Sequence, residues 1–197
     1  MNKAIFLDRD GVINVDKKPI LIEHLGKTVI GYAHKPEHFE FIPRAIEALK
    51  KLSNTNYLLI IITSQSGIGR GYFSEDQFQE FNKYMLNIFE KEGIKIHDIF
   101  FCPHHPEKGV GKYKIDCNCR KPKPGMILNA AKKHNINLKE SFVIGDSRRD
   151  IEMGENAGCK TIFVNTNKLN GEEFKKINAN FNSKDLFEAT ELILKND

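Results

Sequence analysis

The chain has 197 residues, of which 40% are hydrophobic and 28% charged, a composition typical of a globular protein with one sizeable core. Its formal charge of +4, from 30 basic and 26 acidic residues, attracts anions slightly and does not indicate nucleic-acid binding. No apolar run approaches the roughly 18 residues of a membrane helix, and Met1 is followed by a strand pattern rather than a signal peptide. We therefore expect a single domain over residues 1–197 in the cytoplasm.

The first predicted element is a short buried strand, Ala4 to Leu7, which ends in two acidic residues. Asp8 and Asp10 have the i and i+2 spacing that places side chains on one side of a strand. Carboxylates so close together repel each other, and we expect a divalent hard cation to compensate them. Gly11 suits a sharp turn and a close approach of a ligand to the main chain. A solvated strand end with a turn is the alternative interpretation.

Residues 15–41 form a long irregular stretch, and such long loops in a compact domain tend to be functional. Because residues 27–32 have the pattern of a hairpin arm, we expect a flap beside the active centre. A helix over Pro43–Leu52 and a central parallel strand over Tyr57–Ile62 follow. The polar, glycine-rich stretch from Thr63 to Gly71 can cradle a phosphate, although most such stretches are ordinary loops.

Helix and strand patterns alternate through the rest of the chain. Ser74 and Gln77 form a capping-box signature that predicts a helix to about Gly93, and Cys159 is expected in the core. The other expected elements are a strand over Ile99–Phe101, a helix over Pro124–His134, a strand over Phe142–Ile144, a helix over Arg149–Ala157, a strand over Thr161–Val164 and a final helix over Ser183–Leu194. This alternation predicts an α/β fold, a doubly wound parallel sheet with helices on both faces, whose ligands bind at the carboxyl ends of the strands.

A Cys-x-His pair and a Cys-x-Cys pair are separated by 12 residues. Cys102, His104, Cys117 and Cys119 are a suitable set for a tetrahedral structural Zn²⁺ with no open position. The segment between the pairs has little apolar content, so a metal would supply the missing constraint. Free cysteines beside a chance histidine are the alternative, and His105 could replace His104. Clustered cysteines also fit a reducing compartment better than disulfides do.

Four motifs in order along the chain resemble those of the haloacid dehalogenase-like (HAD) phosphatases. They are Asp8-x-Asp10-Gly-Val, Thr63 at the end of an apolar strand, Lys121 in Arg-Lys-Pro, and Gly145-Asp146 with Asp150. The resemblance implies that Asp8 is a nucleophile that forms an aspartyl-phosphate and that Asp10 is the general acid and base. It also implies that Thr63 and Lys121 bind the phosphoryl oxygens.

The resemblance further implies a catalytic Mg²⁺ held by Asp8, Asp146 and the main-chain carbonyl of Asp10. Asp150 could be another ligand or an orienting group behind the ligands, and we favour the orienting role. Because no large cap domain is visible in the sequence, we expect a minimal cap over a small open site, with the zinc loop at 102–119 as a staple. We expect the protein to be a monomer.

Within this superfamily, the chain closely resembles the D-glycero-D-manno-heptose 1,7-bisphosphate phosphatases. The resemblance is carried by residues 8–14 (Asp-Arg-Asp-Gly-Val-Ile-Asn), 65–68 (Gln-Ser-Gly-Ile), the zinc loop and 120–126 (Arg-Lys-Pro-Lys-Pro-Gly-Met). It implies removal of the C7 phosphate from a small phosphorylated sugar during synthesis of bacterial heptose and lipopolysaccharide precursors. The substrate-binding residues it implies are Ser64, Gln65, Ser66 and Arg120. The chain departs from the family in having Ser64 where Asn is common, and in its longer flap.

Three other functions are compatible with parts of the pattern. Histidinol-phosphate phosphatases share the zinc loop, and nucleic-acid 3′-phosphatases share the aspartate motif. A zinc-stapled nucleic-acid-binding module could use Lys108 to Lys123 as its contact surface. That module would give no role to Asp8, Asp10 and Asp146, whose carboxylates repel phosphate backbones. We therefore expect no nucleic-acid partner and no membrane partner.

Overall fold

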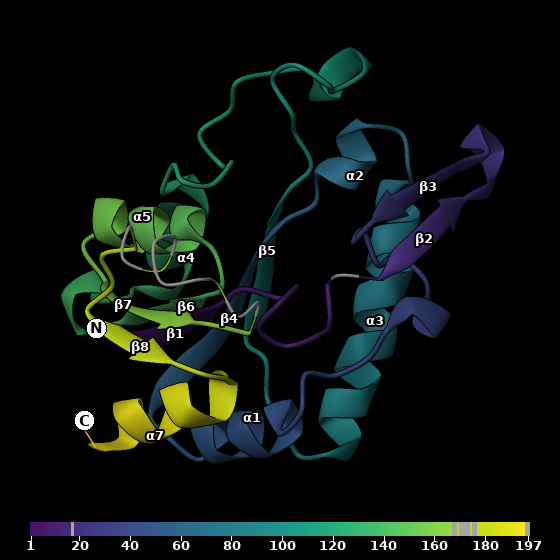
Figure 1. Cartoon of the computed structure of the whole chain (residues 1–197). Coiled ribbons are helices and arrows are strands. Elements are labelled where there is room, and N and C mark those ends of the chain that lie inside the picture. Colours follow the sequence, from purple (N-terminus) through teal and green to yellow (C-terminus); the bar gives the residue numbers. More distant parts are fainter. Residues whose placement is uncertain (17, 167–168, 170–173, 175–176, 196–197) are drawn as a thin grey trace.

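The computed structural model describes residues 1–16, 18–166, 169, 174 and 177–195, and its centre is a six-stranded sheet (Figure 1). The strands run parallel in the order β5-β4-β1-β6-β7-β8, and an antiparallel pair, β2 and β3, forms a separate hairpin. The strand bounds are β1 Lys3–Leu7, β2 Pro19–Ile22, β3 Lys27–Ile30, β4 Tyr57–Ser64, β5 Asp98–Cys102, β6 Phe142–Gly145, β7 Lys160–Val164 and β8 Phe181–Ser183.

Helices cover both faces of this sheet, as the alternating sequence pattern predicts. In Figure 1, α1 and α7 lie on one side of the sheet and α4 and α5 on the other. The helix bounds are α1 Ala45–Ser53, α2 Ser66–Gly69, α3 Glu75–Lys91, α4 Gly125–His134, α5 Arg148–Ala157 and α7 Leu186–Lys195. The doubly wound α/β fold is therefore confirmed.

The central strand β1 is buried on both faces, which explains its uninterrupted apolar sequence. Ile5 and Leu7 belong to the core under α1 and α7, whereas Ala4 and Phe6 belong to the core under α4 and α5. All four side chains are 0% exposed. β1 therefore holds the residue that follows it, Asp8, on a support fixed by packing from both sides.

Two local features differ from the sequence prediction. The last predicted helix, Ser183–Leu194, is preceded by strand β8, and α7 begins only at Leu186. β8 has three residues that pair with β7, too few for an alternating pattern to be recognised. The glycine-rich stretch after β4 is also not all loop, because residues Ser66–Gly69 form the short helix α2.

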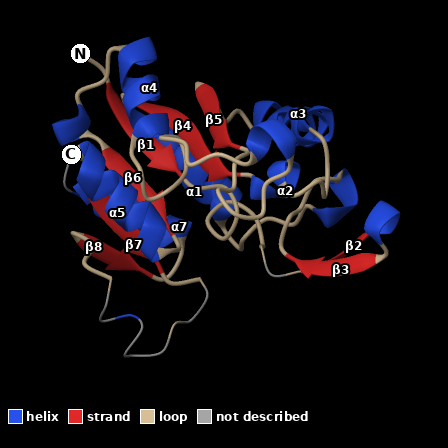
Figure 2. Cartoon of the chain, turned by 90° about the horizontal axis from the view of Figure 1, so that it is seen from above, coloured by secondary structure: helices blue, strands red, loops and turns tan. Residues whose placement is uncertain are grey.

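The predicted flap contains the β2–β3 hairpin, which Figure 2 shows beside α2 and α3 and apart from the main sheet. Ile20, Ile22 and Val29 of the hairpin pack against Phe81 of α3. Lys17 of the flap lies outside the described residues. Within the described ranges, no helix combines the length and apolar character needed to cross a membrane.

Candidate active site

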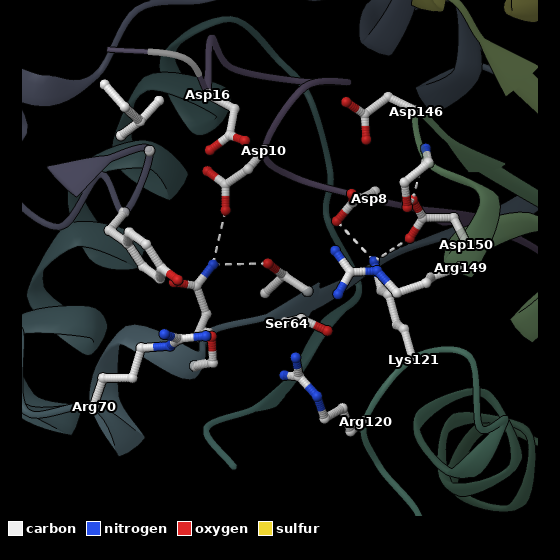
Figure 3. A pocket seen from close by; sticks show the side chains of 17 residues that line it. Asp8, Asp10, Asp16, Ser64, Arg70, Arg120, Lys121, Asp146, Arg149 and Asp150 are labelled. Atoms are coloured by element: carbon white, nitrogen blue, oxygen red, sulfur yellow. Dashed lines mark hydrogen bonds and ion pairs between the residues drawn. The ribbon is translucent and has the colours of Figure 1, made fainter. Parts of the chain in front are cut away.

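A cavity of about 440 Å³ lies at the carboxyl ends of the central strands (Figure 3). Leu7 pairs with Ile61 of β4 and with Ile144 of β6, so the residues that follow these strands meet at one edge of the sheet. The cavity brings together all the predicted catalytic, substrate-binding and magnesium-binding residues: Asp8, Asp10, Thr63, Ser64, Gln65, Ser66, Arg120, Lys121, Asp146 and Asp150.

An ion-paired triad forms the deepest part of the cavity. The Lys121 ammonium lies 2.8 Å from Asp8 Oδ1 and 2.6 Å from Asp150 Oδ1. Asp150, 1% exposed, also accepts hydrogen bonds from the Ser147 amide at 3.1 Å and the Ser147 hydroxyl at 2.5 Å. Asp150 thus contacts the lysine that contacts Asp8, which is the geometry that the predicted orienting role requires.

Burial and like charges set the protonation behaviour of this triad. Burial raises the pKa of Asp8 well above its ordinary value, and Asp150 and Asp146 raise it further, while Lys121 opposes the shift. Burial lowers the pKa of Lys121, but Asp150 and Asp8 outweigh this and leave it above its ordinary value. The lysine is therefore charged at neutral pH, whereas full ionisation of Asp8 is favoured by a further cation.

The carboxylates of Asp8, Asp146 and Asp150 are close enough to hold that cation, since one oxygen from each lies within 4.8 Å of the others. Gly11 makes room for this group. It has a φ of +89°, and a Cβ on it would lie only 2.1 Å from Asp146 Oδ2. Oxygen donors of this kind suit Mg²⁺. Asp10, predicted as a ligand through its main-chain carbonyl, also lines the cavity.

The Asp10 side chain points towards the far wall of the cavity from Lys121 (Figure 3). Its Oδ2 accepts a 2.8 Å hydrogen bond from Gln65 Nε2, and its Oδ1 accepts a 3.0 Å bond from Asn14 Nδ2. The same Gln65 nitrogen donates to Thr63 Oγ1 at 2.8 Å. Gln65 therefore ties the segment after β1 to the end of β4.

Ser64 lies between Asp8 and Arg120 in Figure 3. Its Oγ is buried and has no hydrogen-bond partner within the described part of the chain. Buried hydroxyls are nearly always partnered, so this oxygen marks a place where a bound group completes the network. A phosphoryl oxygen is a suitable acceptor for it.

Three arginines, Arg70, Arg120 and Arg149, also line the cavity, and only Arg120 was predicted from sequence. Burial lowers the pKa of Arg120, and repulsion from Arg149 and Arg70 lowers it further. Arg70 Nε is buried without a hydrogen-bond partner among the described residues. Arg70 lies within the glycine-rich stretch and Arg149 follows the Gly-Asp-Ser motif, and no residue pattern singled them out.

The structure brings the four predicted zinc ligands together, with their ligand atoms within 4.8 Å of one another. Sulfur and nitrogen atoms of Cys102, His104, Cys117 and Cys119 lie 3.1–3.7 Å apart, and the cysteines are not disulfide-bonded. These separations resemble the edges of a tetrahedron around an ion with bonds of about 2.0–2.3 Å, so the residues fit Zn²⁺. His105 instead accepts bonds from backbone amides, which leaves His104 as the imidazole of the cluster.

Comparisons with known proteins show which family this chain belongs to. Residues 118–189 match a family model described as HAD-hydrolase-like. The chain is 46% identical over 177 residues, 89% of both chains, to a D-glycero-β-D-manno-heptose-1,7-bisphosphate 7-phosphatase of Pasteurella multocida. This protein belongs to the heptose bisphosphate phosphatase family of HAD-like enzymes.

Two further relatives extend the comparison to the α-anomer enzymes and to a solved structure. An enzyme of Photorhabdus laumondii named for the α-anomer is 44% identical over 162 residues, 82% of this chain and 81% of that one. The crystal structure of D,D-heptose 1,7-bisphosphate phosphatase from B. bronchiseptica, complexed with magnesium and phosphate, matches with a TM-score of 0.80 and 27% identity over 99% of both chains.

Proposed function

We propose that this member of the family is a Mg²⁺-dependent phosphatase that removes the C7 phosphate from D-glycero-D-manno-heptose 1,7-bisphosphate. Asp8 is the nucleophile, and an in-line attack on phosphorus forms an aspartyl-phosphate. Lys121, fixed between Asp8 and Asp150, binds a phosphoryl oxygen and keeps Asp8 oriented. Thr63, Ser64, Gln65 and Ser66 form the opposite side of the phosphoryl pocket.

Asp10 protonates the leaving sugar oxygen and then takes a proton from the attacking water. Asp8, Asp146 and the main-chain carbonyl of Asp10 would hold Mg²⁺, which offsets the negative charge of the carboxylate and the phosphoryl group. Zn²⁺ held by the Cys/His cluster would be structural, because four protein ligands leave no open position. Cys119 immediately precedes Arg120 and Lys121, so the zinc cluster places both of these side chains.

The observation that carries the proposal is a second anion-binding group in the same cavity as the nucleophile. Arg70, Arg120 and Arg149 gather in the cavity that Lys121 and Asp8 also line, which suits a substrate with a second phosphate. Histidinol phosphate is the alternative substrate, and it has a cationic amine where the bisphosphate has its second phosphate. Three guanidinium groups repel such an amine, so we rank the heptose bisphosphate first.

This function places the protein in synthesis of bacterial surface heptose precursors. A monomer in the cytoplasm, without nucleic-acid or membrane partners and with residues 1–197 as one domain, remains our prediction. Arg149 belongs to α5, Arg70 directly follows α2 and Arg120 directly follows the zinc loop, and all three line one cavity. A nucleic-acid 3′-phosphatase and a nucleic-acid-binding module are therefore weaker candidates.

Phosphate release should be measured with and without Mg²⁺ from the α- and β-anomers of the heptose bisphosphate, heptose 7-phosphate, histidinol phosphate and a 3′-phosphorylated oligonucleotide. We expect Mg²⁺-dependent release with the highest kcat/KM on one heptose bisphosphate anomer. Preference for histidinol phosphate would keep the catalytic roles and reject the substrate. Mg²⁺-independent release would reject the proposed chemistry.

The variant Arg149→Met tests the second anion group. We expect KM for the bisphosphate to rise about 10- to 100-fold, the range of one charged hydrogen bond, while KM for heptose 7-phosphate stays unchanged. Arg44→Met is the matched control, because Arg44 is half exposed at the start of α1 and lies over the Phe187 ring. Equal KM increases for both heptose phosphates would exclude a role of Arg149 at the second phosphate.

A further inference from the structure

Arg9, the residue between the two catalytic aspartates, is fully buried although it carries a charge. Its side chain is 0% exposed, whereas that of its ion-pair partner Asp10 is 18% exposed at the cavity wall. A buried guanidinium is costly unless its donors and its charge are satisfied. The proposed mechanism gives Arg9 no part in binding the substrate or the metal, so its burial needs another explanation.

The contacts of Arg9 explain how the charge is tolerated. Arg9 Nη2 donates to Asp10 Oδ2 at 2.9 Å and Oδ1 at 3.1 Å, and Arg9 Nε donates to Oδ1 at 3.2 Å. The guanidinium carbon lies 4.8 Å from the ring centre of Phe81 and 5.6 Å from that of Phe78, both on α3. A cation over aromatic faces is stabilised by the ring quadrupoles.

Two weaker contacts connect the guanidinium to neighbouring elements. Arg9 Nη1 lies 3.4 Å from Asn82 Oδ1 of α3, and Nη2 lies 3.4 Å from the carbonyl oxygen of Ala33. Ala33 follows Gly31 and Tyr32, which line the cavity at the end of the hairpin. Arg9 therefore joins the Asp10 carboxylate to the buried side of α3 and to the base of the flap.

Three side chains fix the direction of the Asp10 carboxylate, and they differ in what they are attached to. Asn14 and Gln65 donate one hydrogen bond each from the walls of the site. Arg9 contacts both oxygens and is itself anchored in the aromatic core. Planar fork contacts of this type define orientation, because moving either oxygen breaks a bond.

We propose that Arg9 is a positioning residue that aims the Asp10 carboxyl group at the leaving-group oxygen. The inference depends on the proposed function, in which Asp10 protonates the leaving sugar. In that step the C7 oxygen–phosphorus bond breaks, Asp8 oxygen bonds to phosphorus, and the Asp10 proton passes to the departing oxygen. The Arg9 guanidinium exchanges no proton, and Arg9 contacts Asp8 through its main-chain amide, which donates a 2.8 Å hydrogen bond to Asp8 Oδ1.

The role predicts a dependence on the leaving group. A sugar alkoxide is strongly basic and needs a correctly aimed proton donor, whereas p-nitrophenolate departs readily without one. A small displacement of a catalytic group costs about 100-fold in rate. Arg9→Met and Arg9→Lys should therefore lower kcat/KM for the heptose bisphosphate about 100-fold and lower it far less for p-nitrophenyl phosphate.

The experiment measures kcat/KM for both substrates in wild type, Arg9→Met, Arg9→Lys, Asp10→Asn, Arg9→Met/Asp10→Asn and the control Arg44→Met. This constant reports only steps up to departure of the leaving group, so hydrolysis of the aspartyl-phosphate does not obscure it. Melting temperatures and zinc content identify variants that fold poorly. Arg9→Lys retains the charge and loses the fork, so it provides the test if Arg9→Met does not fold.

We expect Arg9→Lys to lower kcat/KM selectively for the sugar substrate, and Asp10→Asn to lower it more. The double variant should show no loss beyond that of Asp10→Asn, because both substitutions impair the same proton transfer. Equal losses on both substrates for folded Arg9 variants would overturn the inference while leaving the function intact. If Asp10→Asn itself shows no selectivity, or wild type is inactive on both substrates, the proposed function fails and the inference falls with it.

Discussion

The carboxylate cluster and the Cys/His cluster depend on the fold in opposite ways. Asp8 and Asp146 follow strands whose side chains are fully packed, and Lys121 already offsets part of their charge. The loop between the Cys/His ligands has exposed apolar residues instead, with Val110 67% and Ile115 45% exposed. The sheet thus positions the first cluster before a cation binds, whereas we expect the second cluster to need a bound metal to position its loop.

The two clusters meet at one point in the chain. Cys119 is a predicted zinc ligand, and Lys121, two residues later, contacts Asp8. Arg120 between them donates a 3.1 Å hydrogen bond to the His104 carbonyl oxygen. If this comparison is right, substitutions in the carboxylate cluster abolish catalysis without unfolding the protein. Substitutions in the Cys/His cluster lower stability and activity together.

The largest effect should follow from Asp8→Asn. Loss of a nucleophile costs on the order of 10⁴- to 10⁶-fold in kcat. The melting temperature without Mg²⁺ should not fall, because the pKa of Asp8 is raised in the folded protein, so its ionised form at pH 7 costs stability. Kinetics and thermal melting with and without Mg²⁺ measure both effects. A lower melting temperature for the variant would mean that Asp8 supports the fold.

Next in size should be the effect of Cys119→Ser. We expect zinc content to fall from about one ion per chain to well below it, with a lower melting temperature and a loss of activity of roughly 100-fold as Lys121 shifts. Cys159→Ala is the matched control, because Cys159 is a buried thiol that is not one of the four residues of the Cys/His cluster. A zinc-depleted variant with unchanged melting and activity would contradict the proposed dependence of the loop on metal.

A smaller effect should separate two glycines with positive φ. Gly11→Ala forces a Cβ against Asp146, whereas Gly26→Ala, at φ +57°, has nothing within 4 Å. We expect Gly11→Ala to raise the Mg²⁺ concentration that gives half-maximal activity by about 10- to 100-fold, the range seen when the support of a metal ligand is disturbed. Gly26→Ala should only lower stability by about 1 kcal/mol. Equal Mg²⁺ titrations for both variants would exclude this role of Gly11.

The smallest effect concerns thiol reactivity, measured at Cys119 of the Cys/His cluster and at Cys159 of the core. The neighbouring Cys102 thiol lowers the pKa of Cys119 to about 5, while burial raises the pKa of Cys159 to about 12. Thiolates are the reactive form, so after chelation Cys119 should be alkylated by iodoacetamide even at about pH 6, and Cys159 should not. Peptide mapping measures this, and modification of Cys159 first would reverse the predicted order.

The sequence predicted the sheet and much of the site because strand patterns and motifs coincide. Asp8, Asp146 and Thr63 each end an apolar run, and parallel strands bring such ends together. The clustering of Cys102, His104, Cys117 and Cys119 was predicted for a different reason, since residue type and spacing alone define a tetrahedral set. The spacing and the family resemblance already favoured His104 over His105, and in the structure the His105 ring accepts hydrogen bonds from backbone amides instead.

The missed features depend on contacts between distant segments. β8 is recognisable only from its pairing with β7, and Arg70 and Arg149 lie near Arg120 only because α2, the zinc loop and α5 converge. Arg9 could have been noticed from sequence as a cation between two acids. Its burial against Phe78 and Phe81 could not, because these residues belong to α3, about 70 positions later.

The β2–β3 hairpin is a two-stranded sheet of its own, and Ala33 at its base contacts Arg9 beside the site. Ile30, 62% exposed, lines the cavity, yet its strand adds nothing to the ladder that supports Asp8. Mutations in the hairpin can therefore change the shape of the sugar pocket without touching the strand ends that carry the chemistry. Such a division lets substrate preference diversify during evolution while the catalytic apparatus stays constant.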